Sequence, residues 1–337
     1  MKILLYSDCH FSTYSSIIRK RGERFSARLE NLIKSINWAE DLSYNEKCDA
    51  VVCLGDFFDN SIISAEECTA LQEIEWCNIP HYFLVGNHEI SYANTETSSA
   101  HVLSLLDRIK VVDHAKSEFF DDCEICFLPY TQTYDSIAKI FGEQKHKRIV
   151  LSHNDISGIN YGAFISQIGF DVDDITNNCD LFLNGHLHNG SQINRCIHNI
   201  GNLTGQNFGE DATHYKHSAF ILDTDDLSLT EHENPYAYNF YKLLINDDDY
   251  SVFQTLKNNA VITIKCNESN YSTLSAFVSS NSSISECRII VDRRQVDVEE
   301  KHEIEAVDHL KQFIKFVFEN YGQSEAIVSE LSKVCDK

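Results

Sequence analysis

The chain has 337 residues, of which 43% are hydrophobic and 23% charged, a length that allows one large domain or two of ordinary size. Aromatic residues make up 11%, and with only 3 Pro and 13 Gly the composition excludes a disordered, collagen-like or low-complexity protein. The formal net charge of -23 predicts a long-range field that repels nucleic acids and anionic membranes, so any nucleic-acid function must overcome it.

The first part of the chain alternates short apolar runs with helical stretches. Helices are predicted at 25–42, 65–76 and 98–107. Strands that alternate with helices predict an α/β sheet, and ligands gather at the carboxyl ends of the strands in such sheets, so we expect one convergent site. Five runs rich in Val, Ile, Leu or Phe each end near a polar residue that can bind a metal ion: 2–6 with Asp8, 50–54 with Asp56, 82–85 with Asn87, 149–151 with His153 and 181–183 with His186.

A polar segment at 223–235 follows a further strand-like run at 218–223, and we place a domain boundary there, between 1–235 and 236–337. The second unit is smaller and is predicted to be α+β. Its last two helices either cover their own domain or bind a partner's coiled coil. The elements predicted in this unit are strands at 260–265 and 288–292 and helices at 271–278, 299–320 and 325–334.

Candidate metal ligands cluster in five short motifs. Each motif alone is common in turns or in cores, but five of them in this order, each at a strand end, form a specific pattern. In chain order they are Asp8-x-His10, Gly55-Asp56-x-x-Asp59, Gly86-Asn87-His88-Glu89, His153 and Gly185-His186-x-His188.

Carboxylate, amide and imidazole groups in this number suit two divalent ions about 3.5 to 4 Å apart, which need one ligand that bridges them. Asp56 is predicted to be that bridge. The mixed oxygen and nitrogen donors favour Mn²⁺, Fe or Zn²⁺ over Mg²⁺ or Ca²⁺, and the sequence does not choose among the first three. One ion would take Asp8, His10 and His188 as its other ligands, and the second would take Asn87, His153 and His186.

Such a pair of ions predicts phosphoester hydrolysis. A hydroxide held by both ions is a nucleophile at neutral pH, and the ions neutralise the charge that builds on a phosphoryl group. His88 directly follows the ligand Asn87 and is predicted to contact the phosphate or to protonate the leaving oxygen. Two interpretations of Asp59 stay open: it holds the other ring nitrogen of His88, or it caps a helix that follows the strand.

Cysteine use and hydropathy indicate a cytoplasmic protein. No apolar run approaches the roughly 18 residues of a membrane helix, and Asp8 comes too early for a signal sequence. The 12 Cys are scattered, and we expect buried, reduced thiols. The pair Cys123-x-x-Cys126 lacks the second pair that a zinc site needs, which favours a structural role.

One dense basic cluster stands out against the acidic background. At near-helical spacing, such a cluster is either a solvated face or a contact for phosphates. Its members are Arg19, Lys20, Arg21, Arg24 and Arg28.

The five motifs resemble those of the calcineurin-like metallophosphoesterase superfamily, across residues 1–235. Within it, the segment Ile-Gly-Asn-Leu-Thr-Gly-Gln-Asn-Phe-Gly-Glu at 200–210 looks like the one that follows the His-x-His motif in SbcD-type nucleases. The total length, the strand-like run 220–224 and the Glu-Asn-Pro junction at 233–235 are similar to phage recombination endonuclease subunits. The resemblance implies a β-sandwich flanked by helices, followed by a small α+β capping domain.

The resemblance also implies a function. Such proteins are manganese-dependent nucleases, typically dimeric, that process DNA ends in repair and recombination with an SbcC-like coiled-coil ATPase. In them the seven ligand positions bind metal, the position of His88 is catalytic, and the region after the first motif, here the basic cluster, approaches DNA. Two departures concern leaving-group protonation: some relatives carry His where this chain has Asp59, and many carry Asp where it has Glu89.

Two alternative functions remain. A phosphatase or small-nucleotide phosphodiesterase would use the same metals, and the acidity of the chain favours it over a nuclease. Protein phosphatases share Gly-Asn-His-Glu but have Arg at the position of Asn60, which argues against that branch. A non-catalytic scaffold is disfavoured because it has no need of seven ligands together with His88.

Overall fold

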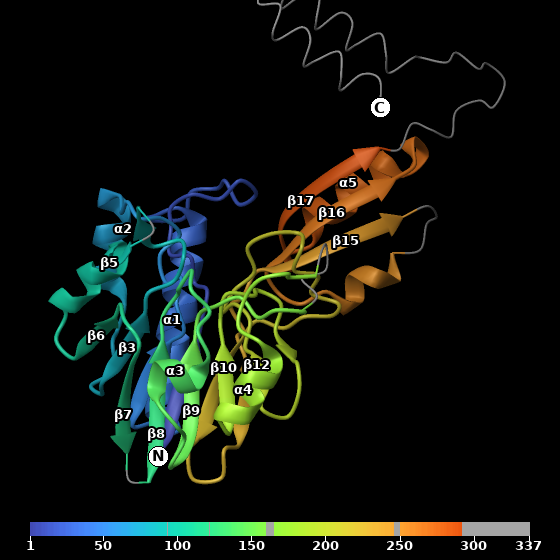
Figure 1. Cartoon of the computed structure of the whole chain (residues 1–337). Helices are drawn as coiled ribbons and strands as arrows, with labels where there is room; N and C mark the ends of the chain where they lie inside the picture. Colours follow the sequence, from blue (N-terminus) through green and yellow to red (C-terminus); the bar gives the residue numbers. More distant parts are fainter. Residues whose placement is uncertain (93, 121, 160–164, 246–249, 292–337) are drawn as a thin grey trace, which may run out of the picture. The chain divides into compact units, whose positions relative to one another are not determined.

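The structure is a computed structural model that describes residues 1–291 with the exception of 93, 121, 160–164 and 246–249 (Figure 1). The helices predicted at 299–320 and 325–334 lie outside the described residues. Among the helices that are described, none combines the length and the apolar character needed to span a bilayer.

Two six-stranded sheets carry the first part of the chain. The first runs in the order β14 (Leu229–Glu233), β13 (Ser218–Asp223), β1 (Lys2–Tyr6), β2 (Ala50–Cys53), β3 (His81–Leu84) and β6 (Ile109–Val112). The second runs β11 (Ser191–Gln192), β12 (Ile197–Asn199), β10 (Leu181–Asn184), β9 (Lys147–Ser152), β8 (Cys123–Leu128) and β7 (Lys116–Phe120).

Both sheets have a parallel core, with antiparallel strands at one edge of the first sheet and at both edges of the second. In the first sheet, β1, β2, β3 and β6 are parallel, and β13 and β14 are antiparallel additions. In the second, β8, β9, β10 and β12 are parallel, and β7 and β11 pair with them antiparallel. The five ligand-bearing runs that the sequence predicted as strands are β1, β2, β3, β9 and β10.

The strands of the first sheet bury both faces, because successive side chains of a strand point to opposite sides. Ile3 and Leu5 of β1 pack in the core that also holds Phe127 of the second sheet. Leu4 lies in a separate core with Leu32 of helix α1 (Ala27–Asn45), so this helix covers the outer face of the first sheet.

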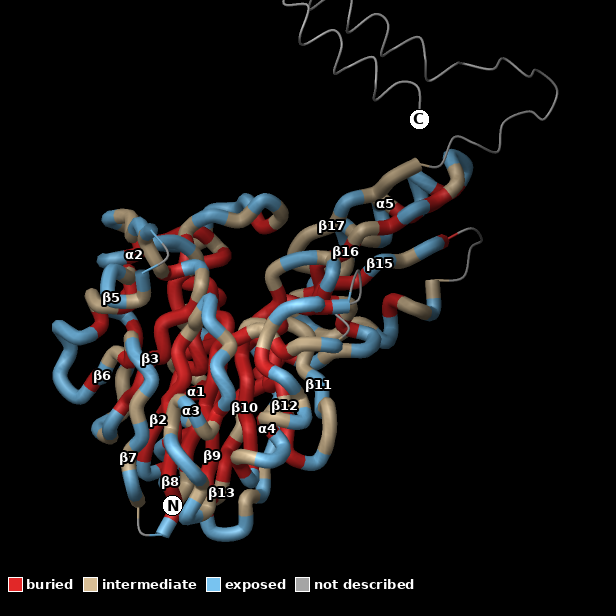
Figure 2. The backbone as a smooth tube through the Cα atoms, viewed as in Figure 1, coloured by how far each residue is buried: buried red, intermediate tan, exposed pale blue. Residues whose placement is uncertain are grey.

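The second sheet is covered in the same way. Its outer core contains Phe182 of β10 together with Ile137 of α3 (Ile137–Phe141) and Ile175 of α4 (Val172–Asn178). The buried strands lie at the centre of the tube drawing in Figure 2. The layers are therefore helix, sheet, sheet and helix, which confirms the predicted β-sandwich flanked by helices.

The cysteines fit this layering. Cys123 and Cys126 lie on opposite faces of β8, one in the core between the sheets and the other in the outer core. They cannot bind one ion together, so their role is structural. The described cysteines are free thiols and most are buried, with Cys68 exposed.

Two of the predicted helices are shorter and tighter than expected. α2 (Ala65–Ala70) begins with a capping box between Ser64 and Glu67, and the chain then tightens into the 3₁₀ turn η1 (Leu71–Glu73). The helix predicted at 98–107 is the 3₁₀ helix η2 (Ser99–Leu105). Residues three apart align in a 3₁₀ helix, and this places both Ala100 and Leu103 in the core.

A third sheet follows, with a hydrophobic core of its own. Its strands β15 (Asn239–Ile245), β16 (Ala260–Cys266) and β17 (Ile284–Val291) are parallel, and α5 (Tyr271–Ser280) connects the last two. The predicted β-α-β piece is thus present, with β15 added, whereas the domain division at residue 235 remains a proposal. The remaining elements are β4 (Ile90–Ser91), β5 (Asn94–Ser98), η3 (Ser251–Thr255) and η4 (Glu268–Asn270).

Candidate metal centre

The loops that carry the candidate ligands follow the carboxyl ends of five parallel strands. β1, β2 and β3 contribute from the first sheet, and β9 and β10 contribute from the second. The sequence predicted one site at the end of one sheet. The structure brings the ligands together from both sheets of the sandwich.

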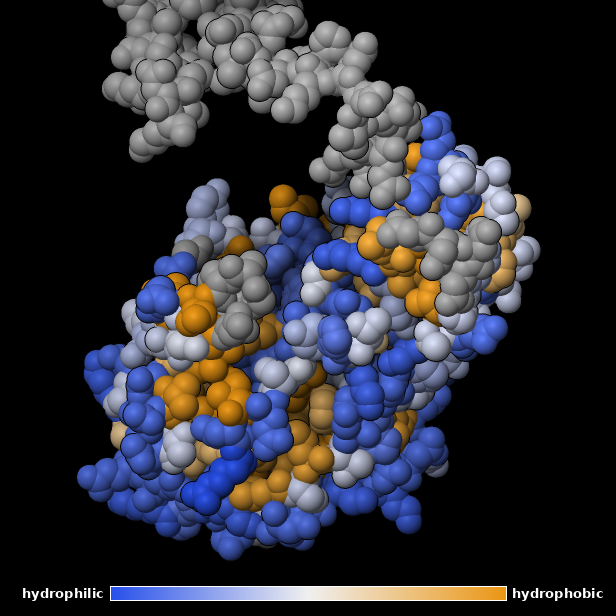
Figure 3. Space-filling model, turned by 90° about the vertical axis from the view of Figure 1, so that its right-hand side faces the viewer, coloured by the Kyte–Doolittle hydropathy of each residue, from blue (hydrophilic) through white to orange (hydrophobic). Residues whose placement is uncertain are grey.

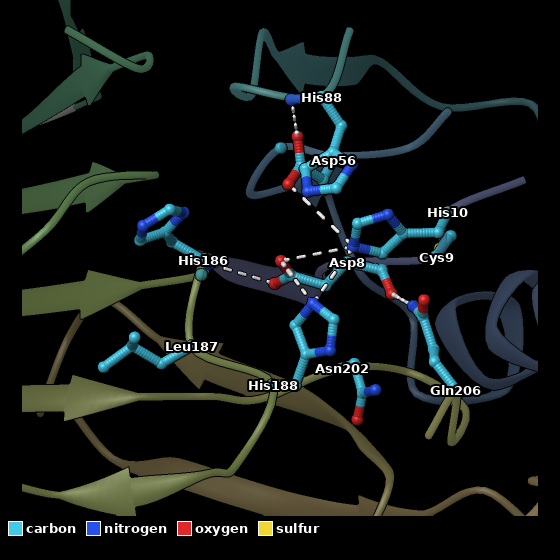
Figure 4. Close-up of polar contacts among 12 residues, drawn as sticks. Asp8, Cys9, His10, Asp56, His88, His186, Leu187, His188, Asn202 and Gln206 are labelled. Atoms are coloured by element: carbon cyan, nitrogen blue, oxygen red, sulfur yellow. Dashed lines mark hydrogen bonds and ion pairs between the residues drawn. The ribbon is translucent and has the colours of Figure 1, made fainter. Parts of the chain in front are cut away.

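A first group of ligands surrounds the carboxylate of Asp8 (Figure 4). Its Oδ1 lies 4.0 Å from Nε2 of His10 and 3.9 Å from Nε2 of His188. The two imidazole Nε2 atoms are 3.1 Å apart. The other carboxylate oxygen of Asp8 accepts a hydrogen bond from the backbone N–H of His186 at 3.0 Å, which ties the first motif to the last.

A second group surrounds the side chain of Asn87. Its Oδ1 lies 2.9 Å from Nδ1 of His186 and 3.3 Å from Nε2 of His153. The carboxylate Oδ2 of Asp56 lies 3.1 Å from the same His153 nitrogen and 3.9 Å from Nε2 of His10. Asp56 therefore reaches both groups, as a bridging ligand must.

The residues fit a pair of divalent ions. Nitrogen and oxygen donors converge within 4.8 Å of one another in the Asp8, His10, His188 group and in the Asp56, His153, His186 group. Oδ1 of Asp8 is fully buried and accepts no hydrogen bond from the described residues, although a buried carboxylate oxygen needs a cation or a donor. This atom points to the space between the imidazoles, where an ion would satisfy it.

Three of the four ligand imidazoles are oriented through their Nδ1 atoms, a common arrangement around metal sites. Nδ1 of His10 bonds to Oδ1 of Asp59 at 2.9 Å, and Nδ1 of His153 bonds to the carbonyl of Leu54 at 2.6 Å. Nδ1 of His188 bonds to Oε1 of Glu210 at 2.7 Å. Each contact leaves Nε2 with its lone pair toward the centre.

Four ligands have left-handed backbone conformations, which are rare outside glycine. The φ angles are 51° at Asp8, 47° at His10, 48° at Asp56 and 72° at His186. Backbone hydrogen bonds hold the first two loops together, from the N–H of Asp8 to the carbonyl of Gly55 and from the N–H of His10 to that of Asp56. Strained backbone gathered in this way is typical of a functional site.

Two glycines let the ligands pack directly on the backbone. Gly55 has a φ of 106°, and a Cβ there would come within 2.3 Å of Nδ1 of His153. A Cβ on Gly86 would come within 2.1 Å of Oδ1 of Asp56. The Gly-Asp and Gly-Asn pairs of the motifs are thus required by close packing around the ligands.

Two buried carboxyls near the centre have opposite electrostatic environments. Burial alone raises the pKa of Asp56, but the imidazoles of His153 and His10 outweigh it and hold that pKa well below its usual range. Burial and the neighbouring Asp56 raise the pKa of Glu89 to about 8. Glu89 accepts hydrogen bonds from the backbone N–H groups of Gly86 and Phe58, so it links the loops after β2 and β3.

The structure corrects the expected partner of Asp59. Its carboxylate bonds to His10, while Nδ1 of His88 lies 3.7 Å from that carboxylate and 3.2 Å from the backbone carbonyl of Asp59. Asp59 therefore orients His10, a candidate ligand, and the alternative of a helix cap does not apply, because Ser64 caps α2. The ring of His88 lies edge-on against that of His10 and is partly exposed, and its backbone N–H donates to Asp56 at 2.9 Å.

The basic cluster is less available than its sequence suggests. Arg28 is buried and donates to the carbonyls of Gly205 and Cys9, so it is not part of an exposed basic surface, which corrects its assignment as a DNA contact. Exposed ion pairs join Lys20 to Glu286, Arg21 to Glu66 and Arg24 to Glu73. Arg19 is exposed, and within the described residues it has no carboxylate partner.

Sequence reasoning missed two residues that contact the ligands. The carboxylate of Glu210 hydrogen-bonds to His188, and it also accepts hydrogen bonds from the side-chain amide of Asn202 and from the backbone N–H of Gln206. Asp155 lies 3.3 Å from Nε2 of His186. Glu210 ends the segment 200–210 that was singled out by resemblance, and that was the available signal. Asp155 stands two residues after His153 without a motif of its own.

Comparison with known proteins places this geometry in context. The family model for calcineurin-like phosphoesterases matches residues 1–213. No curated protein matches the chain. Solved structures similar to it include TT1561 of Thermus thermophilus (10% identity, TM-score 0.41, covering 69% of this chain and 98% of that one). A second is a dimetal phosphatase from Danio rerio (13% identity, TM-score 0.41, covering 69% of this chain and 96% of that one). A third is the phosphoesterase Yfce from E. coli (12% identity, TM-score 0.33, covering 69% of this chain and 100% of that one).

Proposed function

The chain belongs to the calcineurin-like phosphoesterase family, a family of metal-dependent hydrolases, and we propose that within this family it is a two-metal DNA nuclease. The observation that carries the phosphoesterase chemistry is the position of Asp56, which reaches both ligand groups. The proposal extends to a role as the nuclease subunit of an SbcCD-like complex that processes DNA ends, with Mn²⁺ as the metal.

The protein residues prepare the site for a phosphoryl group. Two bound divalent ions would supply a nucleophile at neutral pH and would neutralise the charge of the phosphate. Asp8, Asp56 and Asn87 offer oxygen donors, and four imidazoles complete the two groups. Three of these imidazoles are held in place by hydrogen bonds before any substrate arrives. Their partners are the carboxylates of Asp59 and Glu210 and the backbone carbonyl of Leu54.

His88 is the candidate general acid of the site. Its ring is partly exposed beside His10, and although one of its ring nitrogens lies within 4.8 Å of ligand atoms of His10 and Asp56, both expected ligand sets are complete without it. Nδ1 of His88 lies 3.2 Å from the backbone carbonyl of Asp59, which favours a proton on that nitrogen. This contact holds the Nδ1 side of the ring in place. His88 would contact the phosphate or protonate the leaving oxygen.

DNA contacts are proposed at the loop after the first motif. A pocket of about 370 Å³ there is lined by residues that include Ser15, Ser16, Arg19 and Lys20. Exposed ion pairs such as that of Lys20 with Glu286 are worth about 0 to 1 kcal/mol, so a DNA phosphate can displace the carboxylate. Arg19 and Lys20 are therefore the best candidates for phosphate contacts among the five basic residues.

The segment 200–210 supports the nuclease proposal over a general phosphoesterase. This stretch resembles SbcD-type nucleases in sequence, and it wraps the first ligand group: Gln206 donates to the carbonyl of Asp8, and Glu210 holds His188. Partners that we propose on the same resemblance are a second copy of the chain and an SbcC-like coiled-coil ATPase. The unit after residue 235 is proposed to cap the site or to bind DNA or that ATPase.

A phosphatase or small-nucleotide phosphodiesterase is the second candidate. The net charge of -23 favours it, because a strongly acidic protein repels a polyanion more than a small ester. On the face drawn in Figure 3, hydrophilic residues surround apolar patches. Nucleases need only local phosphate contacts, so weak DNA binding with steep salt dependence is expected of the isolated chain.

Substrate choice distinguishes the two candidates. We would supply Mn²⁺ and compare end-labelled single- and double-stranded DNA with a generic phosphodiester and a phosphomonoester, with His88→Ala as the blank. The proposal predicts DNA cleavage that disappears in the variant. Turnover of the small esters alone, unchanged when the ATPase partner is added, would favour the second candidate.

A further inference from the structure

A second cluster of metal-binding side chains lies away from the centre described above. It joins Glu40 of α1 to Cys77, in the loop before β3, and to His81, the first residue of β3. Nε2 of His81 lies 3.0 Å from Oε2 of Glu40 and 3.8 Å from Sγ of Cys77. None of these residues belongs to the five motifs.

His81 is held in the orientation that a metal ligand needs. Its Nδ1 lies 2.8 Å from the carbonyl oxygen of Ile79, its one acceptor among the described residues, so Nδ1 carries a proton. Its Nε2 faces a carboxylate and a thiol at once. Ligating histidines in metal sites usually donate their other ring N–H to a backbone carbonyl or a carboxylate in this way.

The distances match the edges of a zinc tetrahedron. With Zn–S near 2.3 Å and Zn–N or Zn–O near 2.0 to 2.1 Å, tetrahedral angles separate sulfur from nitrogen by about 3.6 Å and nitrogen from oxygen by about 3.4 Å. The observed separations of 3.8 Å and 3.0 Å lie close to these values. All three ligand atoms lie within 4.8 Å of one another, so an ion between them needs only small movements.

The carboxylate of Glu40 supplies a second, independent sign. The side chain is 1% exposed, and among the described residues its Oε1 has no hydrogen-bond partner. A buried carboxylate oxygen is unfavourable unless a hydrogen-bond donor or a cation is close to it. Cys77 is half-buried, so one member of the cluster borders solvent.

We propose that Glu40, Cys77 and His81 form a structural site for a zinc-class divalent ion, separate from the phosphoesterase centre. Three protein ligands leave a fourth position for water. The backbone N–H of Cys77 donates to Oε2 of Glu40, and the hydroxyl of Ser43 lies 3.1 Å from Sγ of Cys77, so outer contacts already orient the ligands. The ion links α1 to β3 through Glu40 and His81, and it stabilises the thiolate form of Cys77 over the thiol.

Cobalt spectroscopy of the full chain tests the site. The candidate ligands of the phosphoesterase centre include no thiolate, so a sulfur-to-Co²⁺ charge-transfer band in the near ultraviolet does not arise from that centre. We expect this band in the wild type and in Asp56→Asn, and we expect its loss in Cys77→Ser. Cys287→Ser is the matched control, because Cys287 is equally half-buried and lies outside the cluster.

Thiol protection in the unmodified chain keeps the test independent of folding in the variants. Alkylation of Cys77 by iodoacetamide should slow when Zn²⁺ is added, while the exposed Cys68 reacts at the same rate with and without the ion. Wild-type protein that binds Co²⁺ without the sulfur band, or equal alkylation of Cys77 with and without Zn²⁺, would overturn the proposal. The pair of His81 and Glu40 would then be held by a proton instead of an ion.

Discussion

Nδ1 of His10 donates a hydrogen bond to Oδ1 of Asp59 at 2.9 Å, while Nε2 of the same ring lies 3.1 Å from Nε2 of His188. One carboxylate therefore fixes which nitrogen of His10 is free to bind an ion. The ring of His88 lies edge-on against the His10 ring that is held in this way. Asp59 acts on the chemistry through His10.

Replacement of Asp59 should weaken metal binding as well as turnover. Loss of a contact of this kind typically costs about 10- to 100-fold in metal affinity or activity. We expect Asp59→Ala to raise the dissociation constant of Mn²⁺ by such a factor, and Asp59→Asn, whose amide oxygen can still accept from Nδ1, to recover most of it. Unchanged Mn²⁺ affinity with reduced turnover in Asp59→Ala would instead assign Asp59 to His88.

His88 and Asp56 should separate catalysis from metal binding. His88→Ala is expected to keep both ions and to lose turnover by about 10²- to 10⁴-fold, the usual contribution of a general acid or base. Asp56→Ala is expected to lose both, because its carboxylate reaches the two ligand groups. Metal content per chain and initial rates, measured on the same samples, check this prediction. Full activity in His88→Ala would refute its assignment.

The strand ends and the candidate ligands that converge beside them were predictable because both signals are local. A buried strand reads as a short apolar run, and each ligand follows its run within a few residues. The pairing of His10 with Asp59 spans 49 residues and depends on how two loops meet, which no local pattern contains. The same is true of Glu210 and His188.

For Arg28, the sequence contained two conflicting signals, and the one that indicated burial was given less weight. Arg28 lies four residues before Leu32, and residues at this spacing share one face of a helix, so helical periodicity indicates that Arg28 is on the buried face of α1. The density of positive charge around it suggested an exposed surface instead. The 3₁₀ helix at Ser99–Leu105 was missed for another reason, since short apolar spacing does not separate α from 3₁₀ turns.

Removal of one partner of a buried ion pair in the second sheet should destabilise the protein strongly. The guanidinium of Arg148 bonds to Glu124 at 2.8 Å and to the carbonyl of Gly142 at 3.0 Å, and the side chain is 1% exposed. Arg148→Ala leaves Glu124 buried without its partner and should lower the free energy of unfolding by about 3 to 5 kcal/mol. Lys139→Ala, which removes an exposed pair, should change it by about 0.5 kcal/mol or less.

Urea denaturation measures both changes. A double variant that replaces Arg148 with Met and Glu124 with Leu should be less destabilised than Arg148→Ala, because it leaves no unpaired charge. Equal losses in Arg148→Ala and Lys139→Ala would contradict this account of the pair.

His217 should give the protein an acid-sensitive contribution to stability. Burial lowers the pKa of His217 to about 4, against the opposing charge of Glu210. Its folded-state pKa lies below the ordinary value of 6.5, so the contribution is fully present above pH 6.5 and is lost as the pH falls toward 4. A difference of this size corresponds to about 3 kcal/mol.

The free energy of unfolding measured between pH 7 and pH 4 tests this sign. His217→Gln should lose less stability than the wild type across that window, because glutamine takes up no proton. His214→Gln changes an exposed histidine nearby and should follow the wild-type curve. A wild-type curve parallel to that of His217→Gln would contradict the prediction.

Electron paramagnetic resonance of the Mn²⁺-loaded chain shows whether Asp56 joins two ions into one centre, because two bridged Mn²⁺ ions couple and give a signal unlike that of isolated ions. We expect the coupled signal in the wild type and in His88→Ala, and its loss in Asp56→Ala. An isolated-ion signal alone in the fully loaded wild type, or a coupled signal that persists in Asp56→Ala, would refute the bridging role of Asp56.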